Sequence, residues 1–153
     1  MKQKLYIDTS FVGGYYDAEF EEFTIPLIAR IRNKEFNIIY SSVTEEELTN
    51  APEKVKELVR TLPLDCLEYV EVSEESTELA MAYLSENVVG KTSFVDCLHI
   101  ALATIHKADI LVSWNFKHIV NVTRIRGYNS VNLKLGYSMI DIRSPRELIK
   151  YED

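Results

Sequence analysis

Lys4-Leu5-Tyr6-Ile7-Asp8 joins a short apolar run to a carboxylate near the start of the chain. A run of this kind predicts a buried strand, with Asp8 directly after its end. Similar runs predict strands at residues 37–40, 66–70, 110–113 and 138–141. The segments between them carry apolar residues at helical spacing or begin with residues that favour helix starts. Strands separated by helices predict an α/β domain with a mostly parallel sheet.

Helices are expected at about residues 24–32, 42–48, 52–61 and 74–87, from Thr92 or Ser93 through Ile105, and from Pro145 onward. The first of these contains Pro26, which a helix tolerates best in its first turn, so we expect that helix to begin near Thr24. Gly13 and Gly14 are expected to relax the turn that follows Ser10.

The composition is that of one globular domain. The chain has 153 residues, of which 46% are hydrophobic and 27% charged, so it can form a core and is not a disordered chain. It has no long apolar run, and we expect neither a membrane span nor a signal peptide. Cys66 and Cys97 lie far apart with no C-x-x-C pair, which argues against a disulfide framework or a zinc site and favours a reducing, cytoplasmic setting.

Charge is distributed unevenly along the chain. The formal net charge is −7, from 24 acidic and 17 basic residues, which argues against a protein that coats DNA. Between Asp109 and Asp141, however, all charged side chains are basic: Lys117, Arg124, Arg126 and Lys134. This segment either meets a polyanion or is a solvated face that is basic by chance.

Acidic and amide side chains follow the predicted strands. Asp8 follows the first, Glu45-Glu46-Glu47 lies in the helix after the second, and Asn115 follows the fourth. Asp96 lies in the first turn of a helix with apolar neighbours, where a carboxylate is costly unless it is paired or bound to a metal. Ligands gather at the carboxyl ends of parallel strands, and oxygen ligands suit Mg²⁺ or Mn²⁺ rather than zinc. Each acid also has a structural explanation, as a turn cap, a first-turn acid or a solvated face.

Four motifs carry a resemblance to a known family: LYIDTS at 5–10, SVTEEEL at 42–48, FVDCLHIALA at 94–103 and DILVSWNF at 109–116. In order and spacing the chain resembles PIN-domain proteins, and among these the VapC-like toxins of type II toxin–antitoxin systems. The resemblance implies a three-layer α/β/α domain with a mostly parallel five-stranded sheet over residues 1–142. Residues 143–153 are expected to form a short C-terminal helix or tail of the same domain.

The resemblance also implies a Mg²⁺- or Mn²⁺-dependent nuclease that acts on RNA. Asp8, Glu47 and Asp96 would be its metal-binding acids, and Ser10 and Ser113 would assist through their hydroxyl groups. Glu47 is preferred over its neighbour Glu46 because it directly precedes Leu48. A small antitoxin protein and a second copy of the chain are the implied protein partners.

Asn115 departs from the pattern of the family, which commonly has a fourth acid there. An amide oxygen can bind a hard cation or orient water, but it brings no charge, so we expect weaker metal binding. Two other hypotheses therefore stay open. One is a PIN domain with weak or no activity that binds RNA or protein as an adaptor. The other is a small-molecule-binding α/β domain, which predicts that Asp8 and Asp96 lie far apart.

Residues after Asn115 are candidates for RNA binding. Lys117, Arg124 and Arg126 could hold phosphates flanking the cleaved bond, and Trp114 and Tyr128 could stack bases, although a core position is typical of such residues. His99 is interpreted as a core or surface histidine. Cys97 has no visible base partner, which argues against a thiol nucleophile.

Overall fold

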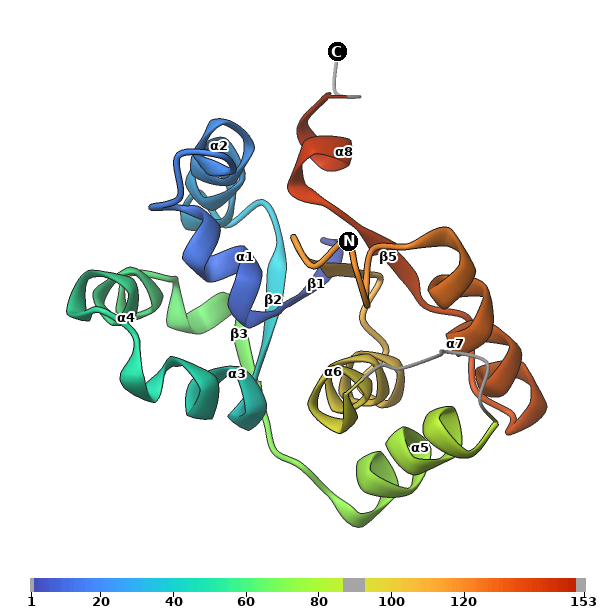
Figure 1. Ribbon diagram of the computed structural model, residues 1–153. Helices are drawn as coiled ribbons and strands as arrows, with labels where there is room; N and C mark the ends of the chain where they lie inside the picture. Colours follow the sequence, from blue (N-terminus) through green and yellow to red (C-terminus); the bar gives the residue numbers. More distant parts are fainter. Residues whose placement is uncertain (1, 87–92, 151–153) are drawn as a thin grey trace.

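A computed structural model describes residues 2–86 and 93–150 of the protein (Figure 1). Its five strands form one parallel sheet in the order β3-β2-β1-β4-β5. The strands are β1 (Lys4–Ile7), β2 (Asn37–Ser41), β3 (Leu67–Val70), β4 (Ile110–Val112) and β5 (Asp141–Arg143). The helices are α1 (Thr9–Gly14), α2 (Glu21–Arg32), α3 (Ser42–Glu47), α4 (Glu53–Arg60), α5 (Glu74–Ser85), α6 (Phe94–Ile105), α7 (Val122–Lys134) and α8 (Pro145–Lys150). The predicted α/β fold with a five-stranded sheet is confirmed.

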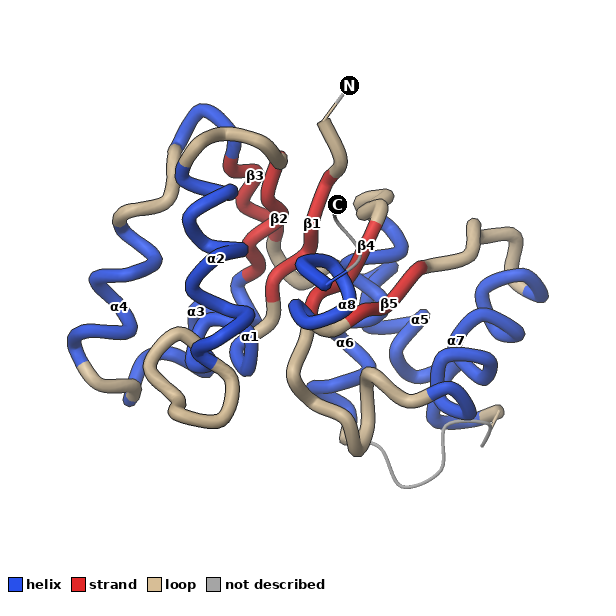
Figure 2. The backbone as a smooth tube through the Cα atoms, turned by 90° about the horizontal axis from the view of Figure 1, so that it is seen from above, coloured by secondary structure: helices blue, strands red, loops and turns tan. Residues whose placement is uncertain are grey.

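Strand β1 lies at the centre of the sheet, between β2 and β4. Its side chains alternate between the two faces, as the geometry of a strand requires. Tyr6 joins the apolar cluster formed with α5, α6 and α7, whereas Leu5 and Ile7 join the cluster formed with α1, α2 and α4. Figures 1 and 2 show these two groups of helices on opposite sides of the sheet. Because all strands are parallel, their carboxyl ends lie at one edge, where Asp8 and Ser113 follow β1 and β4.

The last strand begins three residues later than predicted. Ile140 was expected inside the strand, but its backbone pairs with a side chain instead: its N–H donates to Oδ1 of Asn129 at 2.7 Å and its carbonyl accepts from Nδ2 at 3.0 Å. The sheet ladder therefore begins only at Asp141, which pairs with Ile110. Ile142 supplies the buried side chain of β5.

Helix α7 was not predicted. Its buried positions include Gly127, Asn129 and Asn132, residues that hide the apolar periodicity on which helix prediction depends. Asn132 accepts from the Tyr83 hydroxyl and donates to Thr104, so α7 packs partly through a buried polar network. A sequence pattern cannot identify such a network, because its partners lie on other helices.

Two details near the N-terminus also differ from expectation. Gly13 and Gly14 belong to helix α1 and not to a turn. Helix α2 begins at Glu21 and not near Thr24, so Pro26 lies in its second turn. Both Glu22 and Pro26 are exposed, and water can therefore replace the hydrogen bond that a proline cannot donate.

The remaining boundaries agree with the prediction to within a few residues, and Ser93 is the N-cap of α6. The alternative cap, Thr92, lies outside the described residues. Across residues 2–86 and 93–150, no helix has the length and apolar character needed to cross a bilayer.

Candidate functional site

Asp8 is the most buried carboxylate of the site, at 3% exposure, and lies between β1 and α1. It is the N-cap of α1, where Oδ1 accepts from the Phe11 N–H at 2.9 Å. The hydroxyl of Ser10 donates to it at 2.9 Å and that of Ser113 at 2.5 Å. Burial raises the pKa of Asp8 and outweighs the opposing effects of His99 and these hydrogen bonds. A buried carboxylate of this kind is stabilised by any cation that reaches it.

The loop after β4 is fixed to Asp8 through the same two serines. The Trp114 N–H donates to Ser10 Oγ, and the Asn115 N–H donates to Ser113 Oγ, each at 2.9 Å. The side-chain oxygen of Asn115 accepts from the His118 N–H at 3.0 Å. Ser10 and Ser113 thus lie against Asp8, while the oxygen of Asn115 caps a turn.

Glu47, at the end of α3, is held by two donors. Oε1 accepts from the Thr9 hydroxyl at 2.7 Å and lies 2.7 Å from His99 Nε2. Partial burial raises the pKa of Glu47, but the hydrogen bonds from His99 and Thr9 outweigh it, and the net pKa lies below its usual range. Glu47 is therefore an ionised carboxylate close to neutral pH. Glu46 is exposed.

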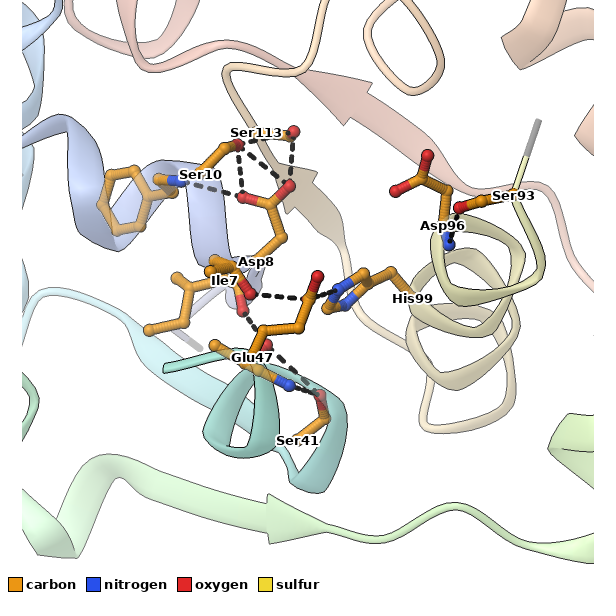
Figure 3. A network of polar contacts seen from close by, with 12 residues as sticks. Ile7, Asp8, Ser10, Ser41, Glu47, Ser93, Asp96, His99 and Ser113 are labelled. Carbon is orange, nitrogen blue, oxygen red and sulfur yellow. Dashed lines mark hydrogen bonds and ion pairs between the residues drawn. The ribbon is translucent and has the colours of Figure 1, made fainter. Parts of the chain in front are cut away.

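Asp96 lies in the first turn of α6, whose N-cap Ser93 accepts from the Asp96 N–H at 3.1 Å. Its carboxylate is half-buried and makes no hydrogen bond with any residue of the described ranges. Figure 3 shows Asp8, Glu47 and Asp96 around one region at the carboxyl edge of the sheet, Asp8 directly after β1, Glu47 in α3 and Asp96 in α6. The topology thus brings the three predicted acids to one edge.

Contacts between the acids run through their neighbours. His99 connects Glu47 to α6, which also carries Asp96. Thr9, the residue after Asp8, connects Glu47 to the start of α1. Within residues 2–86 and 93–150, no three His, Cys, Asp or Glu side chains lie close enough to hold a metal ion as they stand. The donor chemistry nevertheless fits a hard divalent cation, because the carboxylates of Asp8, Glu47 and Asp96 supply oxygen ligands only.

His99 and Thr9 are the site residues that the sequence did not predict. His99 is 2% exposed and lies one helical turn after Asp96. A spacing of three residues places two side chains on neighbouring positions of one helix face, and this spacing was the signal available in the sequence. Cys97 points into the core, where burial raises the pKa of its thiol to about 12, which leaves no thiolate for catalysis.

The predicted RNA-binding residues have different surroundings. Lys117 and Arg126 are exposed, whereas Arg124 is half-buried. Arg126 lines a groove of about 440 Å³ between α7 and β5 together with Phe116. Trp114 and Tyr128 are both buried, so neither is available to stack a base and that suggestion is wrong. Phe116, in the same loop, has an aromatic ring that is 49% exposed.

The chain matches one family model and resembles several solved structures. The PIN domain family model matches residues 5–117. VapC20 of Mycobacterium tuberculosis, a toxin that cleaves the Sarcin-Ricin loop, aligns with a TM-score of 0.59 at 16% identity, over 74% of this chain and 92% of that chain. DNA-bound VapBC of Salmonella typhimurium aligns with a TM-score of 0.59 at 14% identity, over 94% and 98% of the two chains.

FitAcB of Neisseria gonorrhoeae also aligns with a TM-score of 0.59, at 11% identity, over 92% of this chain and 97% of that chain. At identities this low, the solved structures establish a shared fold alone. No curated protein sequence matches the chain significantly.

Proposed function

Because the chain belongs to the PIN domain family, the family of the VapC toxin nucleases, we propose that it is a Mg²⁺- or Mn²⁺-dependent endoribonuclease and the toxin of a toxin–antitoxin pair. The observation that carries the proposal is the convergence of Asp8, Glu47 and Asp96 on one edge of the sheet (Figure 3). Three carboxylates in one region repel one another, and a divalent cation relieves this repulsion.

Each residue has a defined part in the proposed reaction. Asp8, Glu47 and Asp96 hold the ion, which when bound supplies positive charge that polarises the phosphodiester and makes water a better nucleophile. Ser10 and Ser113 keep the Asp8 carboxylate in one orientation through their hydroxyl hydrogen bonds. Lys117 and Arg126 hold phosphates on either side of the cleaved bond. The carboxylates alone would repel the RNA backbone, so the reaction requires the ion.

Titration with Mn²⁺, followed by calorimetry, tests the proposed site directly. The wild type is expected to bind the ion and Asp96→Asn to lose this binding. Within the described ranges the half-buried carboxylate of Asp96 makes no hydrogen bond, so both of its oxygens are available to the ion, and the substitution removes their charge. Cleavage of single-stranded RNA that needs Mn²⁺ and stops in the presence of a chelator then identifies the activity. Absence of binding in both proteins would favour the adaptor hypothesis, which Asn115 also favours because it brings no charge.

Asn115→Asp is expected to tighten Mn²⁺ binding by at least about tenfold, because a carboxylate about 4 Å from a divalent cation contributes about 2 kcal/mol even in water, and about 1.4 kcal/mol is tenfold in affinity. A carboxylate oxygen at position 115 still accepts from the His118 N–H, so the fold should persist. Calorimetry measures the affinity of both proteins under the same buffer conditions. An unchanged affinity would mean that residue 115 does not face the ion.

Lys117→Ala and Arg126→Ala are expected to weaken RNA binding and to reduce its salt dependence. Each phosphate that a variant no longer neutralises lowers the slope of log K against log salt by about 0.7 for a single strand. Fluorescence anisotropy at several salt concentrations measures the slope. Lys34→Ala is the matched control, because Lys34 pairs with Asp65 and lies in the loop before β2, at the opposite edge of the sheet. A slope that Lys34→Ala reduces equally would contradict the assignment.

A protein partner that inhibits the enzyme is part of the same proposal. VapBC and FitAcB, to which the fold is similar, are complexes of two proteins. A groove of about 380 Å³ adjoins Glu47 between α1 and α4, with Tyr16 and Val55 in its walls. A small antitoxin seated in this groove would reach the carboxylates. Dimerisation and a cytoplasmic location remain predictions.

A further inference from the structure

His99 is a buried imidazole whose two nitrogens both have polar partners. Nδ1 lies 2.7 Å from the Tyr6 hydroxyl, and Nε2 lies 2.7 Å from Oε1 of Glu47. Figure 3 shows the ring between α6 and Glu47. A buried polar group is costly without hydrogen bonds, so a core position alone requires only that both nitrogens be satisfied. The two partners of His99 are a buried phenol and a carboxylate of the candidate site, which points to a role for His99 in that site.

The directions of the hydrogen bonds follow from the chemistry of the partners. A carboxylate only accepts, so Nε2 carries the proton and donates to Glu47. Burial raises the pKa of Tyr6 far above its usual range, so Tyr6 is a phenol, and in the Nε2–H tautomer of His99 its single proton is donated to Nδ1. The Tyr6 oxygen then accepts from Ser41, whose Oγ lies at 2.7 Å. Ser41 in turn accepts from the Thr44 N–H.

This chain of hydrogen bonds begins in the core and ends on one oxygen of Glu47. His99 and Thr9 both donate to Oε1. Across the described parts of the chain, no hydrogen bond ends on Oε2. A carboxylate with one oxygen held by two donors has a defined orientation, and its second oxygen is free to bind a ligand.

We propose that Tyr6 and His99 are positioning residues that hold the Glu47 carboxylate so that its second oxygen faces the site shared with Asp8 and Asp96. The proposal rests on the proposed metal-dependent function of that site. Glu47 is a long side chain on the last turn of a six-residue helix, and its rotamers would otherwise be mobile. The buried Tyr6–His99 pair supplies a rigid support from β1, which Asp8 directly follows, and from α6, which also carries Asp96.

Substitution of His99 tests the proposal through the affinity for Mn²⁺ alone, without any activity assay. His99→Leu is expected to weaken Mn²⁺ binding by about 10- to 100-fold, the range typical of groups that orient metal ligands. His99→Gln can still donate to Glu47 through its amide and is expected to retain most of the affinity. His106→Leu is the matched control, because His106 ends the same helix and faces Glu68 of β3.

Tyr6→Phe removes only the hydroxyl and keeps the aromatic packing, so it remains informative if His99→Leu fails to fold. It is expected to weaken Mn²⁺ binding less than His99→Leu does, because the bond to Glu47 persists. NMR of the imidazole nitrogens provides a signal without metal. The wild type is expected to show the Nε2–H tautomer, and its Nε2 signal is expected to shift in Glu47→Gln.

The outcomes separate the two proposals. If the wild type does not bind Mn²⁺, the proposed function is overturned and the positioning role falls with it. If the wild type binds Mn²⁺ and His99→Leu binds it equally, the positioning role alone is overturned. A change in thermal stability without a change in affinity has the same meaning, since it identifies His99 as a packing residue only.

Discussion

Asp8→Asn is expected to abolish RNA cleavage and, at the same time, to preserve or raise thermal stability. The amide oxygen can still accept from the Phe11 N–H and cap α1, so the fold keeps its local hydrogen bond. The substitution removes the negative charge that the proposed reaction needs. Activity is expected to fall by more than about 100-fold, since even groups one step removed from a metal change its binding by about 10- to 100-fold.

The gain in stability depends on pH in a defined direction. Burial raises the pKa of Asp8 above its ordinary value of 3.8, so the folded protein resists the ionisation that the unfolded chain undergoes. The wild type therefore loses stability as the pH rises from about 4 through the raised pKa. The Asp8→Asn variant has no carboxyl group to ionise at this position and would show no such decrease. Thermal unfolding in a chelator should show a higher Tm for the variant at pH 7 and a much smaller difference near pH 4.

Asp109→Asn is the control for this experiment. Asp109 is also a carboxylate beside the sheet, but it accepts from the Lys4 N–H at the opposite edge. An amide oxygen can accept the same bond, and the activity should not change. A globally unfolded Asp8→Asn would contradict the prediction and would indicate that the carboxylate is structural.

Gly14→Ala is expected to lower the free energy of unfolding by about 2–4 kcal/mol, whereas Gly13→Ala, one residue earlier, is expected to raise it by about 0.5–1 kcal/mol. A Cβ at Gly14 would lie 2.7 Å from two ring atoms of Trp114 and 2.9 Å from Thr24 Oγ1. A Cβ at Gly13 meets no atom within 4 Å. The pair therefore compares a steric clash with simple helix propensity on the same short helix.

Neither neighbour of Gly14 can move without cost. The Trp114 indole donates to Thr24 Oγ1 at 2.8 Å and stacks on Phe20 at a centroid distance of 4.4 Å. Displacing it adds the loss of a buried hydrogen bond, about 1 kcal/mol, to the strain of overpacking. The corresponding fall in Tm is about 5–15 °C. Thermal and denaturant unfolding measure both variants.

The steric clash of Gly14→Ala with Trp114 is also expected to affect the candidate site around Asp8. The Trp114 N–H donates to Ser10, which donates to Asp8, so a shifted Trp114 changes the support of the carboxylate. Activity of the folded fraction of Gly14→Ala is expected to be lower than that of Gly13→Ala. Equal stability of the two variants would mean that Gly14 is not a packing contact.

The sequence predicted the sheet well because its strands have simple signatures. Runs such as Leu5-Tyr6-Ile7 and Ile110-Leu111-Val112 are short, apolar and bounded by polar residues, and helices separate them. Prediction failed where packing uses polar groups. The backbone of Ile140 bonds to the side chain of Asn129 and not to a neighbouring strand. The buried asparagines of α7 interrupt its apolar pattern, so that helix was not predicted. In both cases the deciding hydrogen bond joins residues whose relation no local pattern reveals.

The candidate acids were also accessible from the sequence, because parallel strands end at one edge and Asp8 directly follows a strand. The sequence could not identify His99 as a partner of Glu47, since the two residues are 52 positions apart. Nor could it identify the cap that Asn115 forms. These depend on how loops pack against the sheet.

The sequence by itself determined the class of fold and the edge of the sheet at which the acids gather, because a chain in which helices separate the strands forms a parallel sheet whose carboxyl ends share one edge. Only the tertiary structure decided which oxygen of Glu47 is held and which is free. That choice is made by Thr9 and by His99, which is itself supported by Tyr6, 93 positions away in the chain. Hydrogen bonds of this kind depend on distances and directions that exist only after the core has formed.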